Sequence, residues 1–241
     1  MSLTNKHIIL THYGSQNSFD ILKNFGASLY HFPMINIVAN SNPKPFNISN
    51  FDYYIFTSKN GVDSFFNLDF VKDKKVSAFC LGDKTESALV DNGISPIFAS
   101  TQNYADNLIA DLLDNKWLNN KKILLVLGNL ADNKLAEGLS SICNIERLNV
   151  YSTNLETSIN KKITNLIDKE NTISIFTSPS AFKAFYKMYN PKKTTLVSIG
   201  KTTSNYIKSL GFTSDIISKE QTYDGISKAI INYYETKKIT I

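Results

Sequence analysis

The chain repeats part of its own sequence at a distance of about half its length. The segment YIFTSKNGVDSFF (54–66) aligns with SIFTSPSAFKAFY (174–186), and FCLGDKTESALVDNGI (79–94) aligns with VSIGKTTSNYIKSLGF (197–212). The first pair shares I-F-T-S before a stretch of helical pattern, and the second shares G-x-x-T, such a stretch, and then Gly. Units that recur in the same order indicate a structure built twice. The 241 residues also suit two domains, so we expect two similar lobes with the same pair of loops.

Short β-branched or aromatic runs alternate with segments of helical spacing. The runs lie at 7–12, 52–58, 76–82, 122–128, 172–178 and 195–200. Between two of them, the segment 105–115 places Leu108, Ile109, Leu112 and Leu113 on one apolar stripe, which predicts a helix. Strands that are apolar on both faces and separated by helices are typical of βαβ units. The pattern therefore predicts an α/β protein with parallel sheets covered by helices.

The charge of the chain argues against a nucleic-acid partner. The formal net charge is +5, but of the 26 basic residues only Arg147 is an arginine. Arginine is the side chain best suited to phosphate forks and guanine edges, and the lysines form no dense tract. No apolar run is long enough to span a membrane, and the start of the chain lacks the apolar centre of a signal peptide. We therefore expect a soluble, cytoplasmic protein with no nucleic-acid or membrane partner.

The cysteines and histidines give no sign of a metal site. Cys80 and Cys143 are the two cysteines, both in apolar surroundings and without CxxC spacing, so we expect buried free thiols. The three histidines, His7, His12 and His31, share no spacing typical of metal ligands. We expect no metal and no metal-binding residues.

The repeated loops follow predicted strands and lead into helices, where open α/β sheets bind ligands. Backbone N–H groups at such helix starts attract anions without arginine. In G-x-x-T, the glycine allows a turn and a close approach to a ligand, while Thr85 and Thr203 are expected to cap the helices. The alternative, that these polar residues are plain helix caps, stays open for each loop taken alone. The candidate substrate-binding residues of the four loops are Thr57, Ser58, Asn60, Gly61, Gly82, Thr85, Ser178, Ser180, Ala181, Gly200, Lys201 and Thr203.

The ordered set of loops, together with the segments LYHFPMINI (29–37), IERLNVYST (145–153) and TYDGI (222–226), resembles the uroporphyrinogen-III synthase family. The resemblance covers nearly the whole chain. It implies two flavodoxin-like parallel-sheet lobes joined by a two-stranded linker, with the second lobe inserted in the first. Lobe one would comprise 1–35 plus 153–241, lobe two 39–149, and the linker strands 36–38 and 150–152.

Four positions depart from the family pattern. His12 and Leu127 stand where arginine is common at two strand ends, Lys59 where proline is common, and Ala181 where glycine is common. The two missing arginines argue against a carboxylate clamp at those strand ends. They leave the backbone-amide loops unaffected.

The resemblance implies a reaction as well as a fold. Hydroxymethylbilane, a linear tetrapyrrole with eight carboxylates, would be cyclised to uroporphyrinogen III with loss of water and inversion of the last pyrrole ring. Two lobes that close on the bilane would fold it for attack at the substituted carbon of that ring. No cofactor is implied. The protein would act as a monomer with transient contact to hydroxymethylbilane synthase.

The family's best candidate for a catalytic acid corresponds to Tyr151. Alternation along a strand at 145–153 would place Tyr151 on a polar face with Arg147. A phenol has an ordinary pKa of about 10, so it is protonated at neutral pH and can donate to a departing oxygen. The alternative, a tyrosine that only packs in the linker, stays open. His12 is a further candidate for substrate contact because it ends the first predicted strand.

Two other functions remain to be weighed. A non-catalytic, two-lobed binder of a small polyanion would use the same amide-rich loops. A nucleotide-dependent Rossmann enzyme is disfavoured because G-x-G-x-x-G is missing, and the surroundings of Lys201 lack the P-loop pattern. Ser58, Ser178 and Ser180 have no nucleophile elbow around them.

Overall fold

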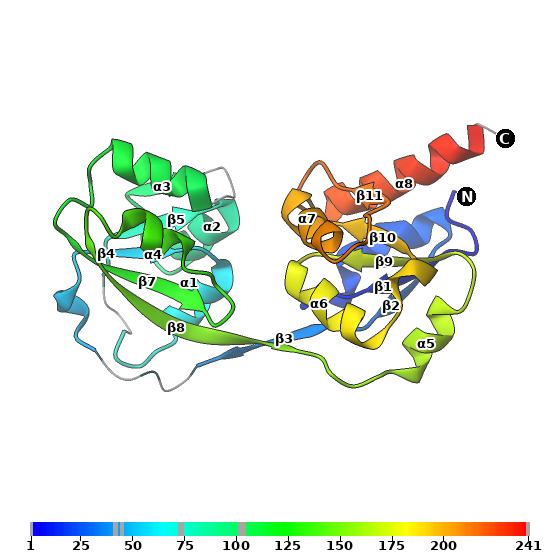
Figure 1. Cartoon of the computed structure of the whole chain (residues 1–241), viewed down its shortest axis with the longest axis horizontal. Helices are drawn as coiled ribbons and strands as arrows, with labels where there is room; N and C mark the ends of the chain where they lie inside the picture. Colours follow the sequence, from blue (N-terminus) through cyan, green and yellow to red (C-terminus); the bar gives the residue numbers. More distant parts are fainter. Residues whose placement is uncertain (1, 41–42, 44–45, 72–74, 101–104, 240–241) are drawn as a thin grey trace. The chain divides into compact units, whose positions relative to one another are not determined.

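The computed structural model of the chain describes residues 2–40, 43, 46–71, 75–100 and 105–239 (Figure 1). The chain forms two compact units. Unit 1 comprises Met1–Asn36 and Asn154–Ile241, and unit 2 comprises Ile37–Thr153. Unit 2 is therefore inserted into the sequence of unit 1.

Unit 1 contains a five-stranded sheet in the order β11-β10-β9-β1-β2, and all its neighbouring strands are parallel. Its strands are β1 (His7–Leu10), β2 (Ser28–His31), β9 (Thr172–Phe176), β10 (Thr195–Ser198) and β11 (Ile216–Ile217). Its helices are η1 (Gln16–Phe25), α5 (Lys161–Ile167), α6 (Pro179–Met188), η3 (Pro191–Lys193), α7 (Lys201–Ser209) and α8 (Tyr223–Ile239).

Helices cover both faces of the unit 1 sheet, because successive side chains of its strands are apolar and point to opposite faces. On one face, Ile9 and Phe176 of the sheet pack with apolar residues of α5, α6 and α7. On the other face, Ile8 and Ile175 pack with residues of η1 and α8. This two-sided cover explains why the strands read as continuous apolar runs.

Unit 2 contains a six-stranded sheet in the order β3-β8-β7-β4-β5-β6. Its strands are β3 (Ile35–Ala39), β4 (Tyr53–Phe56), β5 (Ala78–Leu81), β6 (Phe98–Ser100), β7 (Lys122–Gly128) and β8 (Asn144–Leu155). Its helices are η2 (Ile48–Asn50), α1 (Lys59–Phe66), α2 (Asp83–Asp91), α3 (Ala105–Asp114) and α4 (Lys134–Leu139). The strands from β8 to β6 pair in parallel.

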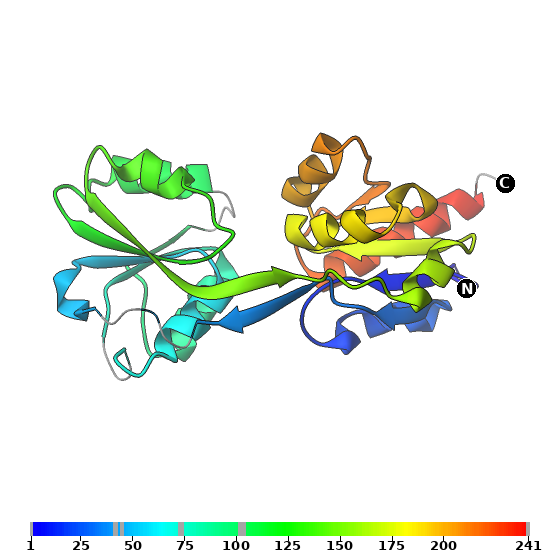
Figure 2. The same ribbon diagram turned by 60° about the horizontal axis from the view of Figure 1, so that its bottom comes forward.

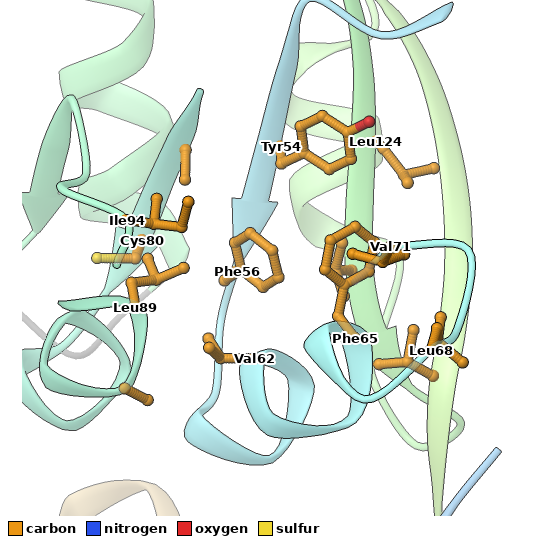
Figure 3. Packing of buried hydrophobic residues seen from close by; sticks show 14 of the residues in the cluster. Tyr54, Phe56, Val62, Phe65, Leu68, Val71, Cys80, Leu89, Ile94 and Leu124 are labelled. Atoms are coloured by element: carbon orange, nitrogen blue, oxygen red, sulfur yellow. The ribbon is translucent and has the colours of Figure 1, made fainter. Parts of the chain in front are cut away.

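The unit 2 sheet also has a core on each face, and helices lie on both of its sides (Figure 2). Val62 and Phe65 of α1 and Leu89 of α2 pack against Phe56 and its neighbours on one face (Figure 3). Leu108 and Leu112 of α3 pack with residues of α4 and the strands on the other face. Each sheet is thus sandwiched between helix layers, and the predicted α/β class with two parallel-sheet lobes is confirmed.

The chain leaves unit 1 through β3 and returns through β8 (Figure 1). In unit 2 the backbone N–H of Asn40 donates to the carbonyl of Val150 (2.8 Å), and in unit 1 the N–H of Glu156 donates to the carbonyl of Met34 (2.9 Å). Partner numbers fall along one strand as they rise along the other, so β3 and β8 are antiparallel. The predicted two-stranded linker is present.

The six strands and the helix expected from the sequence are all present. The strands are shorter than the predicted runs at several ends, because the final Thr-Ser or Gly residues begin the following turn. The short strands β2, β6 and β11 were not predicted, and the residues of β2 were assigned to the segment that leads out of the first lobe. No helix in the described part of the chain is long and apolar enough to cross a membrane.

Candidate functional site

Tyr151 lies on β8, next to an irregularity in its pairing with β7. Leu127 pairs with Asn149, but the next residue, Gly128, pairs with Tyr151, so β8 carries one extra residue at Val150. Such a bulge changes which face the following side chains point to. Tyr151 therefore packs against the same cluster as Leu148 and Val150.

This bulge corrects the prediction that Tyr151 shares a polar face with Arg147. The Arg147 guanidinium donates to the carbonyls of Ala131 and Asp132, both at 2.9 Å, and to the side chain of Asn133. These bonds hold the loop between β7 and α4. Simple alternation failed here because the extra residue in β8 breaks the period of two.

Ser58 is the partner of the Tyr151 hydroxyl. The phenolic oxygen lies 3.1 Å from Ser58 Oγ, and both side chains are partly exposed. Ser58 is also the N-cap of α1, because its Oγ accepts from the N–H of Gly61 at 3.1 Å. The end of β4, the start of α1 and the bulge of β8 thus meet at the carboxyl edge of the unit 2 sheet.

Two glycines leave the space in which the Tyr151 ring lies. A Cβ at Gly128 would overlap the ring and stand 2.8 Å from its hydroxyl oxygen. A Cβ at Gly61 would stand 3.2 Å from Ser58 Oγ and 3.9 Å from the ring. Gly128 was noted in the sequence only as the end of a predicted strand.

Asn129 fixes the backbone at Tyr151 and directly after it. Its N–H donates to the carbonyl of Tyr151 at 3.1 Å, and its Oδ1 accepts from the N–H of Thr153 at 2.8 Å. Sequence reasoning missed this residue. The one available signal was its place directly after a buried strand that ends in glycine.

Unit 1 carries the same cap without a tyrosine. Ser178 Oγ accepts from the N–H of Ala181 at 3.2 Å and lies 3.0 Å from Ser180 Oγ. Thr57 and Thr177 follow their strands at matching positions and are partly exposed, as is Asn60 in the first turn of α1. The repeat seen in the sequence is therefore a repeat of helix-cap geometry.

The glycine loops correct another prediction. Gly82 and Gly200 are themselves the N-cap residues of α2 and α7, and neither helix has a side-chain cap. Thr85 and Thr203 lie within the first turn and are buried, with 3% and 2% exposure. They do not cap because the capping position lies three residues earlier. The first-turn amides of α2 and α7 are consequently not occupied by a capping side chain.

These helix starts differ in what they offer an anion. At α1 and α6 a serine already accepts from the third amide, whereas at α2 and α7 no side chain does. Lys201 is the exposed first residue of α7. An anion is therefore better accommodated at α7 than at α1 and α6, whereas Asp83 and Glu86 place negative charge in the first turn of α2.

His12 lies in the interior of unit 1. Its side chain is 1% exposed, its Nε2 is 2.9 Å from the carbonyl of Ser15, and its ring packs on His31, Phe19 and Tyr223. Burial lowers the pKa of His12, the hydrogen bond to the Ser15 carbonyl opposes this, and His31 lowers it further. Substrate contact was expected from its place after β1, but the following chain folds back and encloses it.

The described residues contain no group of three or more His, Cys, Asp or Glu side chains that is suited to a metal ion. Both cysteines are free thiols, with Cys80 buried and Cys143 half-buried. Burial raises the pKa of the Cys80 thiol to about 12, with a smaller contribution from Glu86. A thiol in this state is a poor nucleophile and a poor metal ligand.

A family model described as Uroporphyrinogen-III synthase HemD matches residues 20–228 of this chain. The chain belongs to this family. Among solved structures, uroporphyrinogen-III synthetase from Helicobacter pylori is similar with 22% identity and a TM-score of 0.68, over 95% of this chain and 99% of that one. A mutant uroporphyrinogen III synthase from Thermus thermophilus is similar with 13% identity and a TM-score of 0.65, over 96% and 99%. Curated protein sequences gave no significant match.

Uroporphyrinogen-III synthases are cyclising lyases of haem biosynthesis, and their substrate is a small tetrapyrrole. The membership agrees with the resemblance read from the loops of the chain. The solved structures support the two-lobed fold. The roles of individual residues rest on the geometry described above.

Proposed function

We propose that this protein cyclises hydroxymethylbilane to uroporphyrinogen III, with loss of water and inversion of the last pyrrole ring, and that Tyr151 is its general acid. The activity is that of the family. For the residue, one observation carries the proposal: Tyr151 is partly exposed at the carboxyl edge of a parallel sheet, and its hydroxyl lies 3.1 Å from the hydroxyl of a helix cap. Parallel α/β sheets bind ligands at this edge.

The proposed chemistry needs little from the protein besides positioning and one proton. The Tyr151 phenol would donate its proton to the hydroxyl of the bilane as the carbon–oxygen bond breaks, so that water leaves. The electron-rich pyrrole that carried the hydroxyl stabilises the resulting azafulvene. The terminal pyrrole then reacts at its substituted carbon through a spiro intermediate, and the proton released when the macrocycle closes balances the one donated.

The carboxylates of the substrate match the helix starts. We propose that the uncapped first turn of α7, which follows Gly200, binds a substrate carboxylate through backbone N–H groups. Lys201 adds a positive charge there. The uncapped first turn of α2, which follows Gly82, is the weaker site, because Asp83 and Glu86 lie in the same turn. At the starts of α1 and α6, Ser58 and Ser178 already occupy the third amide, so these turns offer fewer free N–H groups to a carboxylate.

The test is to incubate the protein with enzymatically generated hydroxymethylbilane, oxidise the product, and separate isomers I and III by chromatography. We expect isomer III at a rate above that of spontaneous closure. Isomer I alone would contradict the enzymatic function and select the binder of a small polyanion. In that case, binding of the intact bilane without closure should be measurable.

The proposal extends to the oligomeric state, the location and the partner of the protein. We propose that the protein acts as a monomer in the cytoplasm and contacts hydroxymethylbilane synthase only transiently. The lability of the substrate supports a short transfer path between the two enzymes. Sedimentation of the pure protein tests the monomeric state, and sedimentation of its mixture with that synthase tests the contact.

A further inference from the structure

We propose that Ser58 is a positioning residue for Tyr151: the Ser58 hydroxyl donates to the phenolic oxygen and so leaves the phenolic proton directed at the substrate. The inference rests on the proposed function, because it assumes that Tyr151 is the acid. It replaces the sequence-based expectation that Ser58 mainly binds substrate.

The Ser58 hydroxyl is held in place by the backbone. Its oxygen accepts from the N–H of Gly61 at 3.1 Å, as an N-cap does, and the residue has extended backbone angles of φ −156° and ψ 149°. A hydroxyl has one proton to donate and can accept twice. Since the bond from Gly61 uses Ser58 Oγ as an acceptor, the serine proton remains available for Tyr151.

The direction of the bond decides what Tyr151 can do. If Tyr151 donated to Ser58, its only proton would be committed to the protein. If Ser58 donates, the phenol keeps its proton for the departing hydroxyl of the bilane. A donor to the phenolic oxygen also stabilises the negative charge that develops as the proton leaves. The start of α1, which polarises Ser58 through the Gly61 N–H, acts in the same direction.

The other half of the repeat supplies an internal comparison. In unit 1, Ser178 makes the same cap on Ala181, but its hydroxyl bonds to Ser180, two residues further along the same segment. In unit 2, the position equivalent to Ser180 is Asn60, and the capping hydroxyl bonds instead to a tyrosine from another strand. The bond to Tyr151 is therefore not a general consequence of this cap.

A second difference between the halves agrees with this role. Gly61 in unit 2 corresponds to Ala181 in unit 1. A Cβ at Gly61 would stand 3.2 Å from Ser58 Oγ and 3.9 Å from Cε1 of Tyr151. Glycine at position 61 therefore leaves room for the contact between Ser58 and Tyr151. Ala181, at the equivalent position of unit 1, follows a serine that bonds to Ser180 instead.

The experiment compares Ser58→Ala, Ser58→Thr, Tyr151→Phe and the double variant Ser58→Ala/Tyr151→Phe. For each, kcat and KM for isomer III, the pH profile of kcat and the thermal midpoint are measured. Asn160→Ala is the control for cap loss, because Asn160 caps α5 in unit 1 by accepting from Lys162 N–H at 2.9 Å. It should lower the thermal midpoint and leave kcat unchanged.

We expect Ser58→Ala to lower kcat roughly threefold to tenfold, as for loss of one net hydrogen bond, with KM within about twofold. The alkaline limb of the pH profile of kcat should move to higher pH, because the phenolate that forms on Tyr151 loses a hydrogen-bond donor. Ser58→Thr should restore most of the activity. In the Tyr151→Phe background, Ser58→Ala should cause no further fall in kcat.

An equal fall of kcat in both backgrounds would overturn the positioning role, and so would a rise in KM alone, since either places Ser58 directly on the substrate. A shift of the alkaline limb to lower pH would show that Tyr151 donates to Ser58, which also overturns it. These outcomes leave the proposed function intact as long as the wild type forms isomer III. A wild type that forms isomer I alone refutes the proposed function, and the role of Ser58 falls with it.

Discussion

The ring of Tyr151 occupies the space that a side chain at position 128 would fill. A methyl group on Gly128 would overlap the ring and lie 2.8 Å from the phenolic oxygen. The β-bulge between β7 and β8 brings these two residues opposite each other. Glycine at the end of β7 is thus a requirement of the tyrosine on β8.

The replacement Gly128→Ala should push the Tyr151 ring away from Ser58. We expect a lower rate of isomer III formation and a loss of about 1–3 kcal/mol in the free energy of unfolding, as for other overpacked sites. Gly138→Ala is the matched control, because its added methyl would meet Ile109 Cδ1 at 2.7 Å in the same unit, away from Tyr151. The control should change the thermal midpoint without changing the rate. Equal rates for both variants would contradict this account.

The replacement Tyr151→Phe removes one hydroxyl and keeps the ring over Gly128. General acids typically contribute about 10²–10⁴ in rate, and we expect the lower end or less, because the pyrrole itself expels the hydroxyl. The thermal midpoint should change little. Single-turnover formation of isomer III measures the effect, with Tyr186→Phe as control, since Tyr186 is 42% exposed on α6. An unchanged rate would leave Tyr151 as a packing residue.

The replacement Arg147→Lys should loosen the loop between β7 and α4. Lysine cannot reproduce the fork that bonds the carbonyls of Ala131 and Asp132. We expect faster hydrogen exchange at residues 130–134 and a loss of about 1–2 kcal/mol in stability, as for one or two partly exposed hydrogen bonds. Substrate KM should stay unchanged. A large rise in KM would instead place the arginine on the substrate.

His12 should make stability depend on pH. Its pKa is lowered by burial from the ordinary 6.5, so the unfolded chain binds the proton first as the pH falls. The free energy of unfolding should therefore be highest above about pH 6.5, where His12 is neutral in both states, and decline below that pH. Thermal midpoints at about pH 5 to 7 measure this, because the carboxyls of Asp52 and Glu156, whose pKa values are lowered by backbone N–H groups, respond only in more acid solution. His12→Phe should flatten the slope, and an identical slope would refute the assignment.

Salt should weaken substrate binding. The Debye length falls from ~10 Å at 0.1 M to ~3 Å at 1 M, so attraction between a polycarboxylate and the helix starts is largely screened. We expect KM to rise over that range. Lys201→Gln should raise KM at low salt and reduce its salt dependence, because it removes a charge at the start of α7. A KM that is flat in salt would contradict the electrostatic account.

The sequence was sufficient for the fold because its periodicities are strong. Apolar runs such as 122–128 and the helical stripe at 105–115 correspond to β7 and α3. The internal repeat predicted two similar lobes, and the repeated segments begin helices with the same type of N-cap residue in both units, serine at α1 and α6 and glycine at α2 and α7. β2 was missed because a four-residue strand, only partly buried, carries little pattern.

The site was harder to predict, for reasons of geometry. The bulge at Val150 has no signature in the residues of β8, yet it determines which face carries Tyr151. The spacing G-x-x-T fits a cap at Thr85 as well as at Gly82, and only the backbone shows that glycine holds that position. His12 follows a strand at the sheet edge where binding residues are expected. Its ring is buried partly by Tyr223, which lies much later in the sequence.

The insertion of one unit into the other determines which unit can fold first during synthesis on the ribosome. β1 lies between β2 and β9, and Thr11 Oγ1 bonds to the carbonyl of Ile175, 164 residues further along the chain. All of unit 2 is translated before β9 exists. The nascent chain can therefore complete the lobe that contains Tyr151 while β1 still lacks its neighbour β9. The tyrosine and its serine can thus be brought together while one side of β1 is still unpaired.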